Sequence, residues 1–157
     1  KSLRHLGYDV EVWACNTSAD VQARLERAQN AAATRGMHPV SHVVISAPWI
    51  QTTDMQRLLM TYPDVQFATV SHSNVGFLAA DPNGIQLLRE AIELEAGFHN
   101  FSLCGNSTKF CKAWELMYGA RTTWLPNLYD VSTMRHVGHR QPWIDGHKLR
   151  IGIFWRY

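Results

Sequence analysis

The alternation of two hydrophobic periodicities along the chain constrains the fold more than any other feature. Short apolar or β-branched runs, typical of strands, occur at 8–14, 42–47, 65–70, 101–104 and 121–125. Between them, apolar residues recur at helical spacing and stop at Gly or Pro. Strands that alternate with helices favour right-handed crossovers and a mostly parallel sheet. We therefore predict an α/β, Rossmann-like fold, a doubly wound parallel sheet with helices on both faces.

The two ends of the chain interrupt this pattern. Residues 1–6 resemble the last turn of a helix that Gly7 stops, so we expect a missing segment in front. Periodicity is lost at 129–147 and returns at 149–155 as an apolar strand with no helix after it. We therefore predict a fold truncated at both ends. Residues 1–128 form a Rossmann-like domain without its first strand, 129–147 an interdomain linker, and 148–157 the first strand of a truncated second domain.

Composition excludes several classes of protein. The formal net charge is only +2 and no Lys/Arg-rich helix is present, which argues against nucleic acid as a partner. Cys15, Cys104 and Cys111 are an odd set without CxxC spacing, so neither a disulfide framework nor a zinc knuckle is indicated. The uncharged stretches contain too many polar residues for a spanning helix. We expect a cytoplasmic protein with no spanning membrane segment.

The turn after the third predicted strand is the richest in chemistry. It contains Ser71, His72, Ser73 and Asn74. In open parallel sheets the ligand crevice lies outside the carboxyl ends of the strands, where an imidazole can take or share a proton. The alternative is a hydrogen-bonded structural histidine, and the sequence leaves both interpretations open.

A second candidate site follows the fourth predicted strand. Gly105 leads into Asn106 and Ser107 at the start of a helix, where backbone N–H groups and a hydroxyl can hold a phosphate or a sugar hydroxyl. The segment is not a P-loop, because GxxxxGK[ST] is absent, and a plain helix N-cap is the alternative. His136, His139 and His147 lack the one-face spacing of a metal site, so no metal is expected.

Other signatures are absent as well. The chain contains no GxGxxG, HExxH, GxSxG or Asp-x-Asp. It therefore lacks the motifs usual in dinucleotide oxidoreductases, zincins, serine hydrolases and metal-dependent sugar transferases.

Five short motifs, in their order and spacing, carry a family resemblance. They are Leu-x-x-Leu-Gly-Tyr-Asp-Val-Glu-Val near the start, Ser-His-Ser-Asn at 71–74, Gly-Asn-Ser at 105–107, Leu-Pro-Asn-Leu-Tyr at 125–129 and Leu-Arg-Ile-Gly at 149–152. Together they resemble the amino-terminal half of a two-Rossmann-domain (GT-B architecture) glycosyltransferase, group 1-like. That class includes sucrose- and glycogen-synthase-like retaining enzymes.

The resemblance implies an acceptor-side domain of an enzyme that transfers a sugar from a nucleotide-sugar donor to an acceptor, without metal or cofactor. His72 would be catalytic and face the reacting sugar, and Arg156 would bind the donor diphosphate. Ser71, Asn74, Asn106 and Ser107 are the expected substrate-binding residues. The carboxyl-terminal donor domain is missing from this pattern, so this half alone is expected to be inactive. The alternative is a stand-alone Rossmann-like module that binds a ligand or partner without catalysis.

Overall fold

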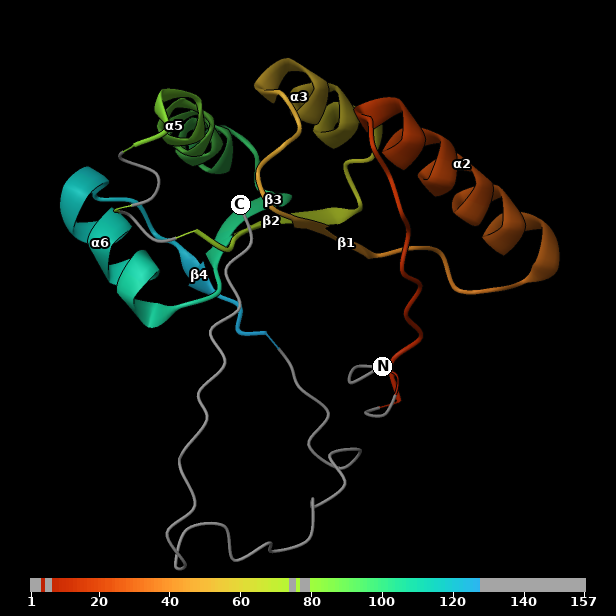
Figure 1. Cartoon of the computed structure of the whole chain (residues 1–157). Coiled ribbons are helices and arrows are strands. Elements are labelled where there is room, and N and C mark those ends of the chain that lie inside the picture. Colours follow the sequence, from red (N-terminus) through yellow and green to blue (C-terminus); the bar gives the residue numbers. More distant parts are fainter. Residues whose placement is uncertain (1–3, 5–6, 74–75, 77–79, 128–157) are drawn as a thin grey trace, which may run out of the picture. The chain divides into compact units, whose positions relative to one another are not determined.

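The computed structural model describes residues 4, 7–73, 76 and 80–127. The chain divides into two compact units, and the fold described below lies in the unit Glu11–Asn127. The elements in chain order are α2 (Ser18–Arg35), β1 (His42–Ser46), α3 (Thr52–Thr61), β2 (Gln66–Ser71), α5 (Pro82–Gly97), β3 (Phe101–Gly105), α6 (Thr108–Tyr118) and β4 (Thr123–Trp124) (Figure 1).

The strands form one parallel sheet in the order β1-β2-β3-β4. Ile45 of β1 lies beside Thr69 of β2, which in turn lies beside Leu103 of β3. Four of the predicted strands are thus confirmed, with ends that differ by at most two residues. The structure is α/β with helices that flank an all-parallel sheet, which is consistent with a Rossmann-like fold.

The predicted strand at 8–14 is wrong. The residues from Tyr8 to Cys15 pair with none of the described strands, and Tyr8 and Val12 are 63% and 84% exposed. Only Trp13 and Cys15 pack against the core. An alternating apolar segment becomes a strand only where a neighbour accepts its backbone hydrogen bonds, and none of the described strands does so here.

Local signals in the sequence set the helix ends. Thr17 and Asp20 form a capping box at the start of α2, and the Asn16 and then the Thr17 hydrogen bonds lower the pKa of the Asp20 carboxyl. Gly36 ends α2 in the left-handed conformation, as Gly119 ends α6. Asp81 caps α5, whose first residue is Pro82. Gly36 and Gly119 confirm the prediction that the helical runs stop at Gly or Pro.

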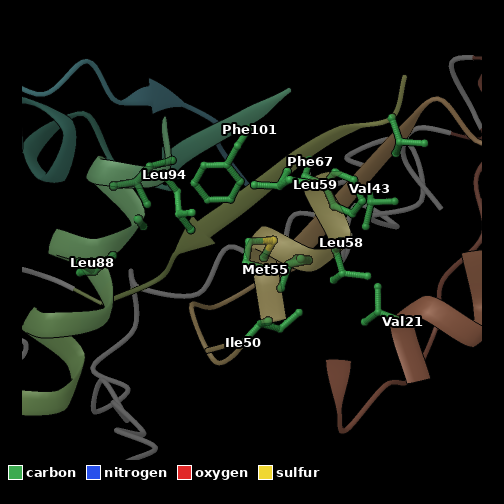
Figure 2. Close-up of a cluster of buried hydrophobic side chains, with 14 of the residues drawn as sticks. Val21, Val43, Ile50, Met55, Leu58, Leu59, Phe67, Leu88, Leu94 and Phe101 are labelled. Carbon is green, nitrogen blue, oxygen red and sulfur yellow. The ribbon is translucent and has the colours of Figure 1, made fainter. Parts of the chain in front are cut away.

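One face of the sheet carries the core (Figure 2). Its strand residues all lie on that face and are Val43, Ile45, Phe67, Phe101 and Leu103. All four helices contribute to the same cluster, for example Val21 from α2 and Trp114 from α6. On the opposite face, Val44 is 57% exposed, whereas Val70 and Cys104 near the carboxyl edge are buried.

The predicted helices on both faces are therefore not found among the described residues. When each parallel strand adds beside the previous one through right-handed crossovers, every helix falls on the same side. Winding on both sides requires a reversal in the order of the strands, and the order β1-β2-β3-β4 contains none.

Asn100 fixes the edge of the sheet where the strands begin. Its side chain is 1% exposed, and Nδ2 donates to the carbonyl oxygens of Leu59, Tyr62 and Val65 at 3.2, 3.2 and 3.3 Å. Leu59 and Tyr62 belong to the end of α3, where carbonyl groups have no partner within the helix. Asn100 thereby joins the end of α3 to the start of β3.

Candidate functional site

Three strand ends meet at one edge of the sheet. Backbone hydrogen bonds continue just past the strands, from Ala47 N to the Val70 oxygen (2.9 Å) and from Asn106 N to the Ser71 oxygen (3.1 Å). Because the strands are parallel, Ser46, His72 and Asn106 all come to the carboxyl edge of the sheet. This is the edge at which the sequence analysis placed the candidate site.

His72 bridges the ends of β1 and β3. Its Nε2 lies 3.0 Å from the Ser46 Oγ, and its Nδ1 lies 3.3 Å from the Asn106 Nδ2. An amide nitrogen can only donate, so Nδ1 accepts from Asn106, and Nε2–H donates to Ser46. The opposite orientation of the Asn106 amide exchanges the two roles. In both cases each ring nitrogen of an exposed imidazole has a hydrogen-bond partner.

Ser46 is the residue that sequence reasoning missed. Ser46 is the last residue of β1, and it lies on the same face of the strand as the exposed Val44. A serine at a strand end carries no signal of its own, since such residues are common in turns. Its position opposite His72 depends on the register in which Ser46 lies beside Val70, which only the structure gives.

The turn that follows Ser46 is strained. Ala47 has φ 76, the one left-handed non-glycine residue among those described. For an L-residue with a Cβ, the left-handed conformation costs about 1–2 kcal/mol in conformational free energy. The hydrogen bonds from Ala47 N to Val70 and from Trp49 N to Ala47 hold the turn. The strain lies directly beside the Ser46–His72 contact, as is common at functional sites.

Gly105 allows the end of β3 to pack closely against the first turn of α6. A Cβ on Gly105 would lie 2.3 Å from Cδ1 of Phe110 and 3.0 Å from Sγ of Cys111. The end of β3 therefore touches the first turn of α6 closely, and only glycine fits there.

The other predicted site residues have different surroundings. Ser107 is the N-cap of α6, where its Oγ accepts from Phe110 N at 3.2 Å, so the alternative interpretation as a plain cap holds for its side chain. Ser71 is 1% exposed, and its Oγ has no hydrogen-bond partner in the part of the chain that the structure describes. Ser71 thus lies beneath the carboxyl edge and contributes its carbonyl group to Asn106. Asn74 and Arg156 lie outside the described residues.

A polar depression lies between the start of α3 and the first half of α5, and both helices begin at this same edge. Its volume is about 340 Å³, and it is lined by Gln51, Asn83, Gln86, Leu87 and Glu90. Glu90 accepts hydrogen bonds from Thr52 and from Gln86, the latter at 2.8 Å. The Thr52 bond first, and then the Gln86 bond, hold the pKa of the Glu90 carboxyl below its usual value. The depression therefore presents an ionised carboxylate and three amide side chains.

The buried thiol of Cys104 is a poor nucleophile. Burial, with smaller contributions from Glu95 and Cys111, raises the pKa of the Cys104 thiol to about 11. Burial also raises the pKa of Glu95, although its Oε1 accepts from Leu103 N at 3.2 Å. At neutral pH Cys104 is a protonated core residue, whereas nucleophilic cysteines require the thiolate.

Within residues 7–73 and 80–127, no three His, Cys, Asp or Glu side chains gather in a way that would hold a metal ion. None of the helices described is both long and apolar enough to cross a membrane.

No family model, curated protein or solved structure matches the chain.

Proposed function

We propose that the chain is the acceptor-side domain of a GT-B glycosyltransferase, which transfers a sugar from a nucleotide-sugar donor to a hydroxyl acceptor. The observation that carries the proposal is His72 at the carboxyl edge, hydrogen-bonded to Ser46 and Asn106. Parallel α/β sheets bind ligands at this edge. The imidazole is exposed there, and its two partners come from the neighbouring strands.

His72 has the chemistry that sugar transfer uses. In the reaction the acceptor oxygen bonds to the anomeric carbon, the bond from that carbon to the diphosphate breaks, and the acceptor loses its proton. A histidine that faces the reacting sugar can stabilise charge or share this proton, with an effect on rate of about 10²-fold or more. Arg156 remains the predicted residue for the leaving diphosphate.

The depression between α3 and α5 supports a saccharide as the acceptor-side ligand. Sugar hydroxyls both donate and accept hydrogen bonds. The Glu90 carboxylate accepts, and the amides of Gln51, Asn83 and Gln86 do both. The carboxylate is already oriented by Thr52 and Gln86, so little ordering is left for ligand binding.

The test is a His72→Ala variant of the full-length protein, assayed with a panel of nucleotide-sugars and acceptors. We expect turnover to fall by about 10²-fold or more with little change in unfolding free energy. His38→Ala is the matched control, because His38 is exposed and has no part in the site. Normal activity per folded His72→Ala molecule would remove His72 from the site.

The second candidate function is a binding module without catalysis. It is favoured by the position of the depression, whose lining residues all fall between Gln51 and Glu90. Such a module needs no second domain to bind a ligand. Saccharide binding by the 157-residue chain, together with no sugar transfer by the full-length protein, would favour this function over the first.

A further inference from the structure

We propose that the Ser46 hydroxyl occupies the place of a ligand hydroxyl, so that ligand binding at His72 requires the Ser46–His72 hydrogen bond to break. An imidazole has only two ring nitrogens, and both are engaged, with Ser46 and with Asn106. A ligand can therefore hydrogen-bond to His72 only by exchange with one of these partners. The inference depends on the proposed function only in taking the ligand hydroxyl to be that of a saccharide.

Ser46 is the partner that exchanges. Its side chain is exposed, and rotation about one χ angle moves its hydroxyl from one staggered position to another. Asn106 is held more firmly, because it is half-buried and its backbone N–H donates to the Ser71 oxygen at 3.1 Å. A ligand that approaches the carboxyl edge therefore reaches Nε2 in place of the Ser46 Oγ.

The exchange replaces one hydroxyl–imidazole hydrogen bond with another of the same kind. Such a bond in a protein changes stability by an amount equivalent to about 2- to 10-fold in an equilibrium constant. Ser46→Ala removes the internal competitor. The variant should bind a hydroxyl ligand at His72 about 2- to 10-fold more tightly than the native chain.

The first arm of the test measures whether the bond to Ser46 shields His72. Diethyl pyrocarbonate acylates a ring nitrogen whose lone pair is free, and peptide mapping by mass spectrometry gives the rate for each histidine of the 157-residue chain. We expect the His72 rate to rise at least about 3-fold in Ser46→Ala. Without the Ser46 oxygen nothing holds the proton on Nε2, so it can move to Nδ1, which donates to the Asn106 amide in its opposite orientation, and the Nε2 lone pair is then free.

The chain provides a matched control for this arm. Ser41 Oγ lies 2.9 Å from Nδ1 of His42 at the start of β1, so the two residues are a second serine–histidine pair, at the other end of the strand. Ser41→Ala should change the rate of His42 and leave that of His72 as in the native chain. An unchanged His72 rate in Ser46→Ala would overturn the proposal.

The second arm measures the ligand, with methyl α-D-glucopyranoside as the probe and tetrahydropyran as a ring of similar size without hydroxyls. We expect the glucoside to protect His72 from acylation, at a concentration about 2- to 10-fold lower in Ser46→Ala than in the native chain. Tetrahydropyran should protect neither chain. Equal protection by both compounds, or no shift between the two chains, would overturn the proposal.

Failure here is distinguishable from failure of the proposed function. Acylation and protection report on hydrogen bonds to His72, whereas the assay of His72→Ala in the full-length protein reports on sugar transfer. A glucoside that displaces Ser46 without any transferase activity would keep this inference and remove catalysis.

Discussion

Replacement of Asn100 should destabilise the fold more than any other single change at a polar residue described here. Asn100→Ala removes the hydrogen bonds from Nδ2 to the carbonyl oxygens of Leu59, Tyr62 and Val65. Two N–H groups serve three acceptors, so about two full bonds are lost. At about 1 kcal/mol for each bond and about 1–3 kcal/mol for a buried acceptor left without a donor, we expect a loss of about 3–5 kcal/mol.

The measurement is urea unfolding followed by tryptophan fluorescence, because Trp114 is buried in the core and its emission reports on tertiary structure. Asn30→Ala serves as the control, since Asn30 lies on the exposed surface of α2 and Ala favours a helix. The control should match or slightly exceed the native stability. A loss below about 0.5 kcal/mol for Asn100→Ala would refute the reasoning, because it would mean that the three carbonyls find other donors.

Asn100→Asp adds a pH-dependent test. The substitution keeps the shape but places a carboxyl against three carbonyl oxygens, so burial should raise the pKa of the introduced group. A raised pKa in the folded state makes stability fall as pH rises through that pKa. The variant should therefore be less stable at pH 7 than at pH 4, relative to the native chain. Equal losses at both values would show that the introduced carboxyl lies in water.

Three further predictions concern the surroundings of the site. Gly105→Ala should cost about 1–3 kcal/mol, because its Cβ would overlap Phe110; urea unfolding measures this, and an unchanged midpoint would show that α6 moves freely. Ala47→Gly should leave the free energy of unfolding unchanged or raise it, because glycine tolerates φ 76. The control Ala33→Gly, on the exposed side of α2, should lower the free energy of unfolding by about 1 kcal/mol. Equal losses in the two variants would argue against strain at Ala47. In the native chain the raised pKa of Glu95 should make the melting temperature fall as pH rises above about 4.5. Glu95→Gln should flatten this fall, while its amide oxygen can still accept from Leu103 N. A slope as steep as in the native chain would contradict this.

The sequence predicted those parts of the fold that depend on local signals. Thr17, Gly36 and Gly119 act within one turn of their own helix, so their effect is readable without the rest of the chain. The strands β1, β2 and β3 are apolar or β-branched on the side that faces the core, which the period of two reveals.

The parts that could not be predicted depend on distant partners. Residues 8–14 become a strand only if a neighbouring strand pairs with them. Helices cover both faces of the sheet only if the order of the strands reverses. Hydrophobic periodicity shows neither of these conditions. The site divides in the same way. His72 and Asn106 stand out because they follow strands, whereas Ser46 reaches His72 only through the register of β1 and β2.

The simple order of the sheet has a consequence for how the chain acquires its structure. Each described strand pairs only with the strands that come just before and after it in the sequence. No strand has to enter between two that are already paired. Such a sheet can grow by successive addition from β1 to β4, and each step closes only the one crossover that joins two neighbouring strands. A chain leaving the ribosome can therefore build this sheet in the order in which it is synthesised.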